Sequence, residues 1–170
     1  GTPADAAWKD RPDGYDYGDG PYHSNDNSQF VLSNSDDQGS GSTTNAILMA
    51  PVLNTTGLTN IQVNFYHYYR DIADAGDTAI VEASLDGTTW SIVQIYTTNQ
   101  GDLDAFVAAN VSLPAIYDNQ STVYVRFRFK ATWDWYWAVD NVVISGSSTD
   151  LVYSWGSNPA GFTSSDANPT

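Results

Sequence analysis

Residues 121–146 read STVYVRFRFKATWDWYWAVDNVVISG, and this stretch predicts two strands joined by a tight aromatic turn. In its first half, apolar and polar residues alternate over 123–130, which is the period of two expected for a strand with one buried face. The second strand is expected over 136–144, and it contains one acidic residue, Asp140. A carboxylate among aliphatic side chains is costly to bury unless it is paired or binds a cation, so Asp140 is the first candidate functional residue.

The composition argues against several classes of protein. The 170 residues carry a formal net charge of −14, from 20 acidic and 6 basic side chains. Nucleic acid is therefore not an expected partner, because that affinity depends on neutralising phosphates. The absence of cysteine excludes disulfides and thiolate metal sites, and no apolar run is long enough for membrane insertion. The acidic surplus fits a secreted protein that binds divalent cations, or simply a soluble, self-repelling surface.

The order of these patterns predicts one domain over residues 1–146. Residues 1–28 are expected to form an irregular lead-in, punctuated by glycine and proline, which Trp8 anchors to the body. Short alternating or apolar runs follow, separated by turns rich in glycine and asparagine, and they predict an all-β, antiparallel β-sandwich. Residues 102–109 are the one segment where a helical turn is expected. Residues 147–170 differ in composition and are expected to be a linker and the truncated start of a further β-domain.

Six segments occur in an order that resembles a known family. Together they are similar to the cleaved-adhesin and MAM-like jelly-roll modules of large bacterial secreted proteins, of which gingipain adhesin modules are the best known. The tail resembles the start of the immunoglobulin-like repeats that follow such modules. The six segments are FVLSNSDD (30–37), ILMAPVLNTTGL (47–58), VNFYHYY (63–69), DTAIVEASLDGTTW (77–90), VYVRFRF (123–129) and WYWAVDNVVI (135–144).

The resemblance implies a non-catalytic jelly roll that is stabilised by calcium. It places the calcium ligands in the acidic stretch after the first strand, at Asn34 and Asp36, and on the last strand at Asp140. Calcium prefers several hard oxygen ligands, and Asp37 lies on the same loop as the first two residues. Asp77, at the start of a strand, is a further candidate ligand. The alternative is that the loop is a solvated acidic turn and that Asp140 caps backbone amides.

A second group of acids follows at a spacing of three: Asp71, Asp74 and Asp77. This spacing is compatible with one face of a helix, but an acidic loop at the edge of the sandwich is the preferred interpretation. Only Asp77 is expected to leave this rim and join the metal site.

The aromatic turn contains candidate ligand-binding residues. Sugar rings stack on flat exposed aromatic rings, so Trp133 and Tyr136 are predicted to bind a glycan, and Asp134 is predicted to accept hydrogen bonds from its hydroxyl groups. The alternative is a role in the core, which alternation along the strand predicts for Trp135 and Trp137.

The sequence offers little for catalysis. Of its two histidines, His67 lies on an apolar strand face and is expected to be a hydrogen-bonded core residue. The segment SLDGTTW at 84–90 resembles the Asp-box of sialidase propellers, but it occurs once, whereas a propeller needs repeats, so a hairpin is expected.

We therefore expect a non-catalytic, extracellular binding or adhesion module of a secreted or cell-surface bacterial protein. Its expected partners are a glycan or a host or matrix protein, together with other domains of the same parent chain. One alternative is a structural spacer attached to a secreted peptidase or glycosidase, and another is a small carbohydrate-active enzyme. Jelly-roll architecture alone does not decide between them.

Overall fold

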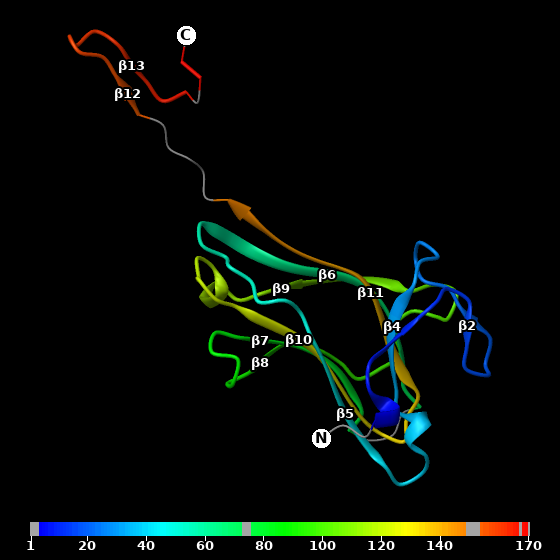
Figure 1. The fold of residues 1–170 in the computed structure, drawn as a ribbon. Helices are drawn as coiled ribbons and strands as arrows, with labels where there is room; N and C mark the ends of the chain where they lie inside the picture. Colours follow the sequence, from blue (N-terminus) through cyan, green and yellow to red (C-terminus); the bar gives the residue numbers. More distant parts are fainter. Residues whose placement is uncertain (1–3, 73–75, 149–153, 167, 170) are drawn as a thin grey trace.

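The computed structural model describes residues 4–72, 76–148, 154–166 and 168–169. Two antiparallel sheets pack face to face in this part of the chain (Figure 1), and no described residue lies in an α-helix. No helix of the described part is long and apolar enough to cross a membrane. The expected all-β, antiparallel jelly-roll β-sandwich is thereby confirmed.

The first sheet has five strands and the second has four. In spatial order the first consists of β1 (Lys9–Arg11), β4 (Phe30–Asn34), β11 (Tyr136–Ser148), β6 (Leu58–Arg70) and β9 (Val107–Ser112). The second consists of β5 (Thr43–Met49), β10 (Tyr124–Thr132), β7 (Thr78–Ser84) and β8 (Ser91–Tyr96). Three short 3₁₀ turns complete the fold: η1 (Ala4–Ala6), η2 (Asp36–Gln38) and η3 (Ala115–Tyr117).

The two strands predicted from residues 121–146 are β10 and β11, and they belong to different sheets. β10 pairs with β5 and β7, whereas β11 pairs with β4 and β6. The intervening turn therefore crosses from one sheet to the other at one end of the sandwich. This crossing places the aromatic residues of the turn among the loops at that end.

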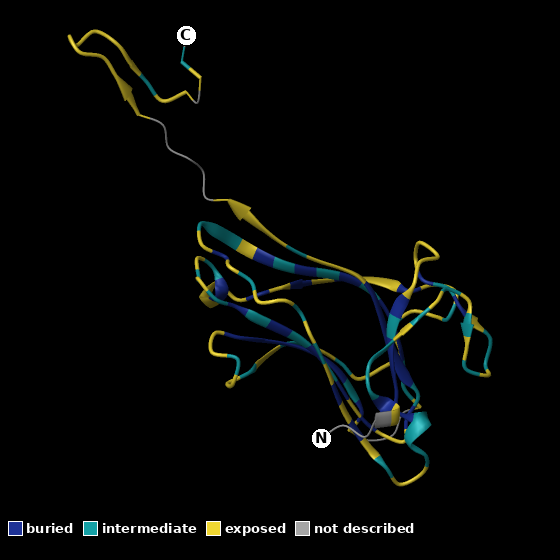
Figure 2. Ribbon diagram, in the orientation of Figure 1, coloured by how far each residue is buried: buried dark blue, intermediate teal, exposed yellow. Residues whose placement is uncertain are grey.

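The core between the sheets comes from the alternating inner positions of the strands, which appear in dark blue in Figure 2. Phe127 of β10 lies 5.1 Å from Phe65 and 5.8 Å from Trp137 of β11, measured between ring centroids. The ring of Trp8 packs edge-on against Trp137 at 5.5 Å. The expected anchoring of the lead-in by Trp8 is thereby confirmed.

A second cluster covers the outer face of the five-stranded sheet. There the hairpin of β2 (Tyr15–Asp16) and β3 (Pro21–Tyr22) lays Tyr22 against Tyr68 and Tyr136. The lead-in is thus partly ordered strand rather than wholly irregular. Because β11 is covered on both faces, residues 136–140 are all buried, and the expectation that Tyr136 is exposed is wrong.

The expected helical turn at 102–109 is also wrong. Asp102 and Ala105 exchange backbone hydrogen bonds of 3.0 and 3.1 Å, and β9 begins at Val107. Gly101 before this turn has a φ of +72°, and a Cβ there would lie 2.9 Å from the carbonyl oxygens of His67 and Ala105. Close packing of this turn on β6 therefore replaces helix formation.

At the C-terminal end, β11 continues to Ser148, two residues past the expected boundary at residue 146. A small hairpin of β12 (Trp155–Gly156) and β13 (Thr163–Ser164) follows, and its residues are mostly exposed. The start of a further β-domain over 147–170 stays a prediction.

His67 is buried in the core, as expected. Its Nδ1 accepts a hydrogen bond of 3.3 Å from the indole nitrogen of Trp137, so the neutral form of the ring is required there. Burial lowers the pKa of His67 to about 4.

This lowered pKa makes the fold sensitive to acid. Below about pH 6.5, the ordinary pKa of histidine, His67 binds a proton in the unfolded chain but stays neutral in the folded chain. The free energy of unfolding therefore falls as the pH decreases from about 6.5 to about 4. We expect this residue to account for a loss of about 3 kcal/mol across that window. Urea unfolding of wild type and His67→Gln at several pH values measures it. The variant should show a smaller acid-induced loss, whereas His23→Gln, which keeps His67, should retain the wild-type loss.

Candidate functional site

Several predicted site residues meet at one end of the sandwich. Tyr136 at the start of β11 pairs with Asn34 at the end of β4 and with Arg70 at the end of β6. We call the residues grouped here the loop rim; they are 34–38, 70–72, 77 and 133–135. The turn η2, drawn in cyan at the lower end of the sandwich in Figure 1, belongs to it.

The turn between β10 and β11 exposes one tryptophan and half-buries another. Trp133 has a φ of +50°, and 45% of its surface is exposed, which confirms the expected exposure. Trp135 is half-buried outside the core, whereas Trp137 lies fully inside it. The core prediction therefore holds for Trp137 and is wrong for Trp135, because strand alternation begins only at Tyr136.

Asp134, between these tryptophans, is 1% exposed and cannot meet a bound sugar as expected. Its Oδ1 accepts hydrogen bonds from the backbone nitrogens of Trp135 at 2.7 Å and Ile72 at 3.1 Å. These bonds tie the turn to the chain after β6. Its Oδ2 is buried and accepts no hydrogen bond from any described residue.

Asp134 faces two further carboxylates. One oxygen each of Asp71, Asp77 and Asp134 lie within 4.8 Å of one another. Asp77 is buried, and its Oδ1 accepts a hydrogen bond of 2.8 Å from the backbone nitrogen of Thr132. Asp77 therefore stays beside Asp71 of the expected acidic loop, and Asp134 joins them. Asp74 lies outside the described residues.

The environment of Asp134 disfavours its negative charge. Burial is the main cause, and the charges of Asp77 and Asp71 add to it, against the opposing effect of the two backbone hydrogen bonds. Together they raise the pKa of Asp134 to about 6. At neutral pH this carboxylate is therefore ionised at a cost in folding free energy.

The loop after β4 turns toward the lead-in. The backbone nitrogen of Asp36 donates a hydrogen bond of 3.1 Å to Oδ1 of buried Asn34, and Oδ2 of Asp36 accepts one of 2.8 Å from the hydroxyl of Tyr17. Burial, then the hydrogen bond to Asp36 and the charge of partly exposed Asp37, raise the pKa of Tyr17. Asp36 also lines a small cavity with Trp133 and Asp134.

Asp140 lies elsewhere. It is four residues along β11 from Tyr136, which is about 13 Å of strand, and alternation turns its side chain to the outer face. There Oδ1 accepts a hydrogen bond of 2.8 Å from the backbone nitrogen of Asn141, and Oδ2 accepts one of 3.4 Å from the hydroxyl of Ser28. Asn141 in turn donates to a carboxylate oxygen of Asp26 at 2.8 Å.

The five predicted metal ligands therefore do not form one group. Asn34, Asp36, Asp37 and Asp77 belong to the loop rim, whereas Asp140 meets the segment of the lead-in around Ser28. The sequence correctly predicted that Asp140 lies on a strand, but it did not predict to which face of the sheet its side chain points.

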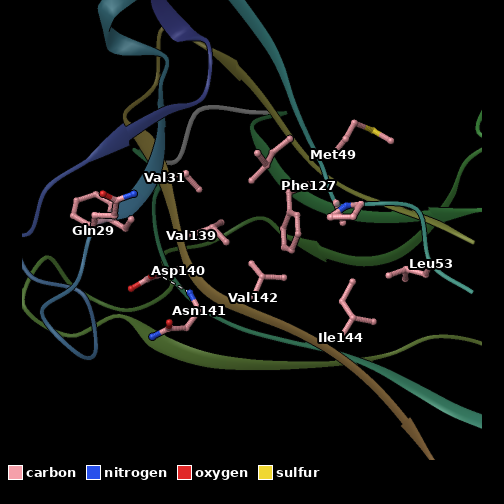
Figure 3. A pocket seen from close by; sticks show the side chains of 14 residues that line it. Gln29, Val31, Met49, Leu53, Phe127, Val139, Asp140, Asn141, Val142 and Ile144 are labelled. Atoms are coloured by element: carbon pink, nitrogen blue, oxygen red, sulfur yellow. Dashed lines mark hydrogen bonds between the residues drawn. The ribbon is translucent and has the colours of Figure 1, made fainter.

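A cavity of about 510 Å³ opens between the two sheets beside β11. Figure 3 shows Phe127, Val139 and Val142 around it, with Asp140 and Asn141 on the opposite side of the strand. Its lining is mainly apolar, and the polar side chains that line it are those of Gln29, Asp140 and Asn141, so most of its wall offers no hydrogen-bond partner to a sugar hydroxyl.

A smaller polar cavity of about 390 Å³ adjoins the loop rim, and the sequence analysis missed it. Arg70 pairs there with Asp19, donates to the hydroxyl of Tyr136 at 3.2 Å, and lies over the ring of Trp135 at 3.9 Å. In a chain with 20 acidic residues, the sequence alone does not distinguish a functional acid such as Asp19 from an ordinary surface acid. The lining residues are Asp19, Tyr68, Arg70, Asn99, Gly101, Asp102 and Leu103.

Comparison with solved structures shows which folds this chain resembles. The K1 cleaved adhesin domain of Lys-gingipain from Porphyromonas gingivalis superposes with a TM-score of 0.60 and 21% identity, covering 85% of this chain and 86% of that one. The K3 domain of the same protein superposes with a TM-score of 0.55 and 21% identity, covering 86% of this chain and 94% of that one. The resemblance to gingipain adhesin modules is thus confirmed at the level of the fold.

A carbohydrate-binding module has a related fold. TmCBM61, solved in complex with β-1,4-galactotriose, gives a TM-score of 0.50 and 11% identity, covering 82% of this chain and 88% of that one. No protein-family model and no curated protein sequence matches the chain. These likenesses establish the architecture, and function must be argued from the residues.

Arg70 should contribute to stability as well as to the polar cavity. Arg70→Met removes the cationic partner of the partly buried Asp19, which keeps its hydrogen bonds from the hydroxyls of Tyr136 and Tyr22, so we expect a loss of about 1–2 kcal/mol. Urea unfolding measures this loss. The double variant Arg70→Met/Asp19→Asn should be less destabilised than the sum of the two single variants. Additive losses would contradict the coupling of the two side chains.

Proposed function

We propose that this chain is a non-catalytic carbohydrate-binding module of a secreted or cell-surface protein, with its binding surface at the loop rim. The observation that carries the proposal is the exposed ring of Trp133 on a turn that buried Asp134 holds in place. Flat exposed aromatic rings are the surfaces on which sugar rings stack. The polar cavity beside Arg70 offers carboxylate, amide and guanidinium groups for hydroxyls at the same end of the sandwich.

The fold supports this proposal. Its architecture is shared with an adhesin domain and with a module whose structure holds a galactotriose. Two alternatives lead to different results in the same assay. A module that adheres to a host or matrix protein would bind that protein and no glycan, and a structural spacer would bind neither.

Catalysis has little support at the polar cavity. Of its two carboxylates, Asp19 accepts hydrogen bonds from Arg70, from Tyr136 at 2.6 Å and from Tyr22 at 2.9 Å. A carboxylate engaged in this way is a poor general acid or base. We therefore keep the non-catalytic interpretation over that of a carbohydrate-active enzyme.

Calcium remains part of the proposal, as the resemblance implies. At Asp140 the residues fit a cation in part. Among the described residues, Oδ2 of this buried carboxylate accepts only the long hydrogen bond from Ser28, and the carboxylate of Asp26 accepts a hydrogen bond from the adjacent Asn141. Asp140 and Asp26 would supply hard oxygen ligands there. Bound calcium would hold the lead-in against β11.

Glycan binding has a direct test on Trp133. Titration of a glycan array, followed by tryptophan fluorescence and calorimetry on the hits, should identify a ligand of wild type. Trp133→Ala should weaken its affinity at least about tenfold, because truncating an aromatic hot-spot residue costs about 2 kcal/mol or more. Trp155→Ala removes a similarly exposed tryptophan of the β12–β13 hairpin and should leave affinity unchanged. No glycan response in wild type, or equal affinity in Trp133→Ala, would overturn the proposal.

A further inference from the structure

We propose that Asp71, Asp77 and Asp134 form a calcium-binding site at the loop rim, separate from Asp140. The resemblance places ligands in the loop after β4 and at Asp140, and the sequence separates the three aspartates between a loop, a strand start and an aromatic turn. The fold brings them together because β6 ends, β7 begins and β10 passes into β11 at the same end of the sandwich.

The spacing of the three carboxylates suits calcium. Their oxygens lie within 4.8 Å of one another. Two oxygens that bind one calcium ion at about 2.4 Å can lie up to about 4.8 Å apart, so this grouping is compatible with ligands that share one ion. Magnesium binds at about 2.1 Å and demands near-ideal octahedral geometry, whereas calcium accepts irregular sets of oxygen ligands. Calcium is therefore the divalent ion that this group of carboxylates fits best.

Buried oxygens at this place point to a ligand independently of the charge. Asp134 is 1% exposed, and its Oδ2 accepts no hydrogen bond from the described residues. Tyr69 of β6 is fully buried, and its hydroxyl likewise has no hydrogen-bond partner within the described part. Tyr69 lies two residues before Asp71, near the end of β6. Buried polar oxygens normally have partners, and a cation would supply one.

The charge balance leads to the same conclusion. In the part of the chain that the structure describes, neither Asp71 nor Asp134 forms an ion pair. The ion pairs found there involve Asp13, Asp19 and Glu82 instead. A buried carboxylate beside a second and a third is costly to ionise unless a cation neutralises it. A divalent ion would neutralise most of the charge of the group.

Bound calcium would fasten three segments of the loop rim to one another. Asp71 follows β6, Asp77 precedes β7, and Asp134 lies in the turn that presents Trp133. The ion would thus fix the position of the exposed tryptophan. This consequence for ligand binding rests on the proposed function, whereas the calcium site does not.

The site can be tested with calcium and without any glycan. The purified chain is stripped with EGTA and titrated with calcium by calorimetry, and its melting temperature is measured in EGTA, millimolar calcium and millimolar magnesium. Binding to the folded state alone raises that temperature, and we expect a rise of about 5 °C or more that magnesium does not reproduce. Terbium provides a second probe, because Tyr69, Trp133 and Trp135 lie near the site and can sensitise its emission.

Three variants locate the ion. Asp134→Asn keeps the oxygen that accepts the two backbone hydrogen bonds, and Asp71→Asn changes a less buried ligand, so both should fold in EGTA. Each should weaken calcium at this site at least about tenfold and abolish most of the sensitised terbium emission. Asp140→Asn, the matched control on β11, should retain this site and its terbium signal.

The outcomes separate the two calcium proposals and the glycan proposal. Calcium binding that survives Asp140→Asn and is lost in Asp134→Asn and Asp71→Asn supports the site. Wild-type binding in both of those variants, loss of all binding in Asp140→Asn, or no calcium-specific binding in wild type would overturn it. Failure of the glycan titration leaves each of these results unchanged.

Discussion

The structure depends on the crossing of the chain from β10 to β11. Residues 133–135 are all that separates two strands of different sheets. Stacked sheets lie about 10 Å apart, and three extended residues span about that distance. The crossing is therefore short, and it includes a tryptophan with a φ of +50°, a conformation that bulky residues seldom adopt. Asp134 holds the crossing in place because it accepts hydrogen bonds from two backbone nitrogens, that of Trp135 within the crossing and that of Ile72 after β6.

This crossing explains why polar chemistry collects at one end of the molecule. The middle of the sandwich is occupied by packed aromatic and aliphatic side chains such as Phe127 and Trp137, which leave no room for charge. At the end, backbone groups of the turns need acceptors, and aspartate supplies them. Asp134 and Asp77 each accept backbone hydrogen bonds there. The residues that complete the fold are thus the residues that create a concentrated negative charge.

The period-two pattern of residues 121–146 was sufficient to predict both central strands and the sandwich, because alternation reports directly on burial of one sheet face. It could not predict the second layer over β11, since Tyr22 reaches Tyr136 from a segment with no regular pattern. The site was predictable in part: Asp77 and Asp134 were recognised as candidates, but with other partners. Their meeting depends on which sheet each strand joins, and the local pattern does not encode that choice. Arg70 and Asp19 were missed for the same reason.

Two titratable side chains are buried where burial disfavours their charged form. His67 and Asp134 both have a pKa shifted toward the neutral form, to about 4 and about 6 respectively, and burial is the leading cause for each. At neutral pH His67 is already uncharged, so its burial next to Trp137 imposes no electrostatic penalty. Asp134 is mostly ionised at that pH, and two further carboxylates surround it. A hydrogen-bonded asparagine would cap the same backbone groups without this penalty. The retention of a carboxylate there is therefore better explained by a function of its charge than by the requirements of the turn.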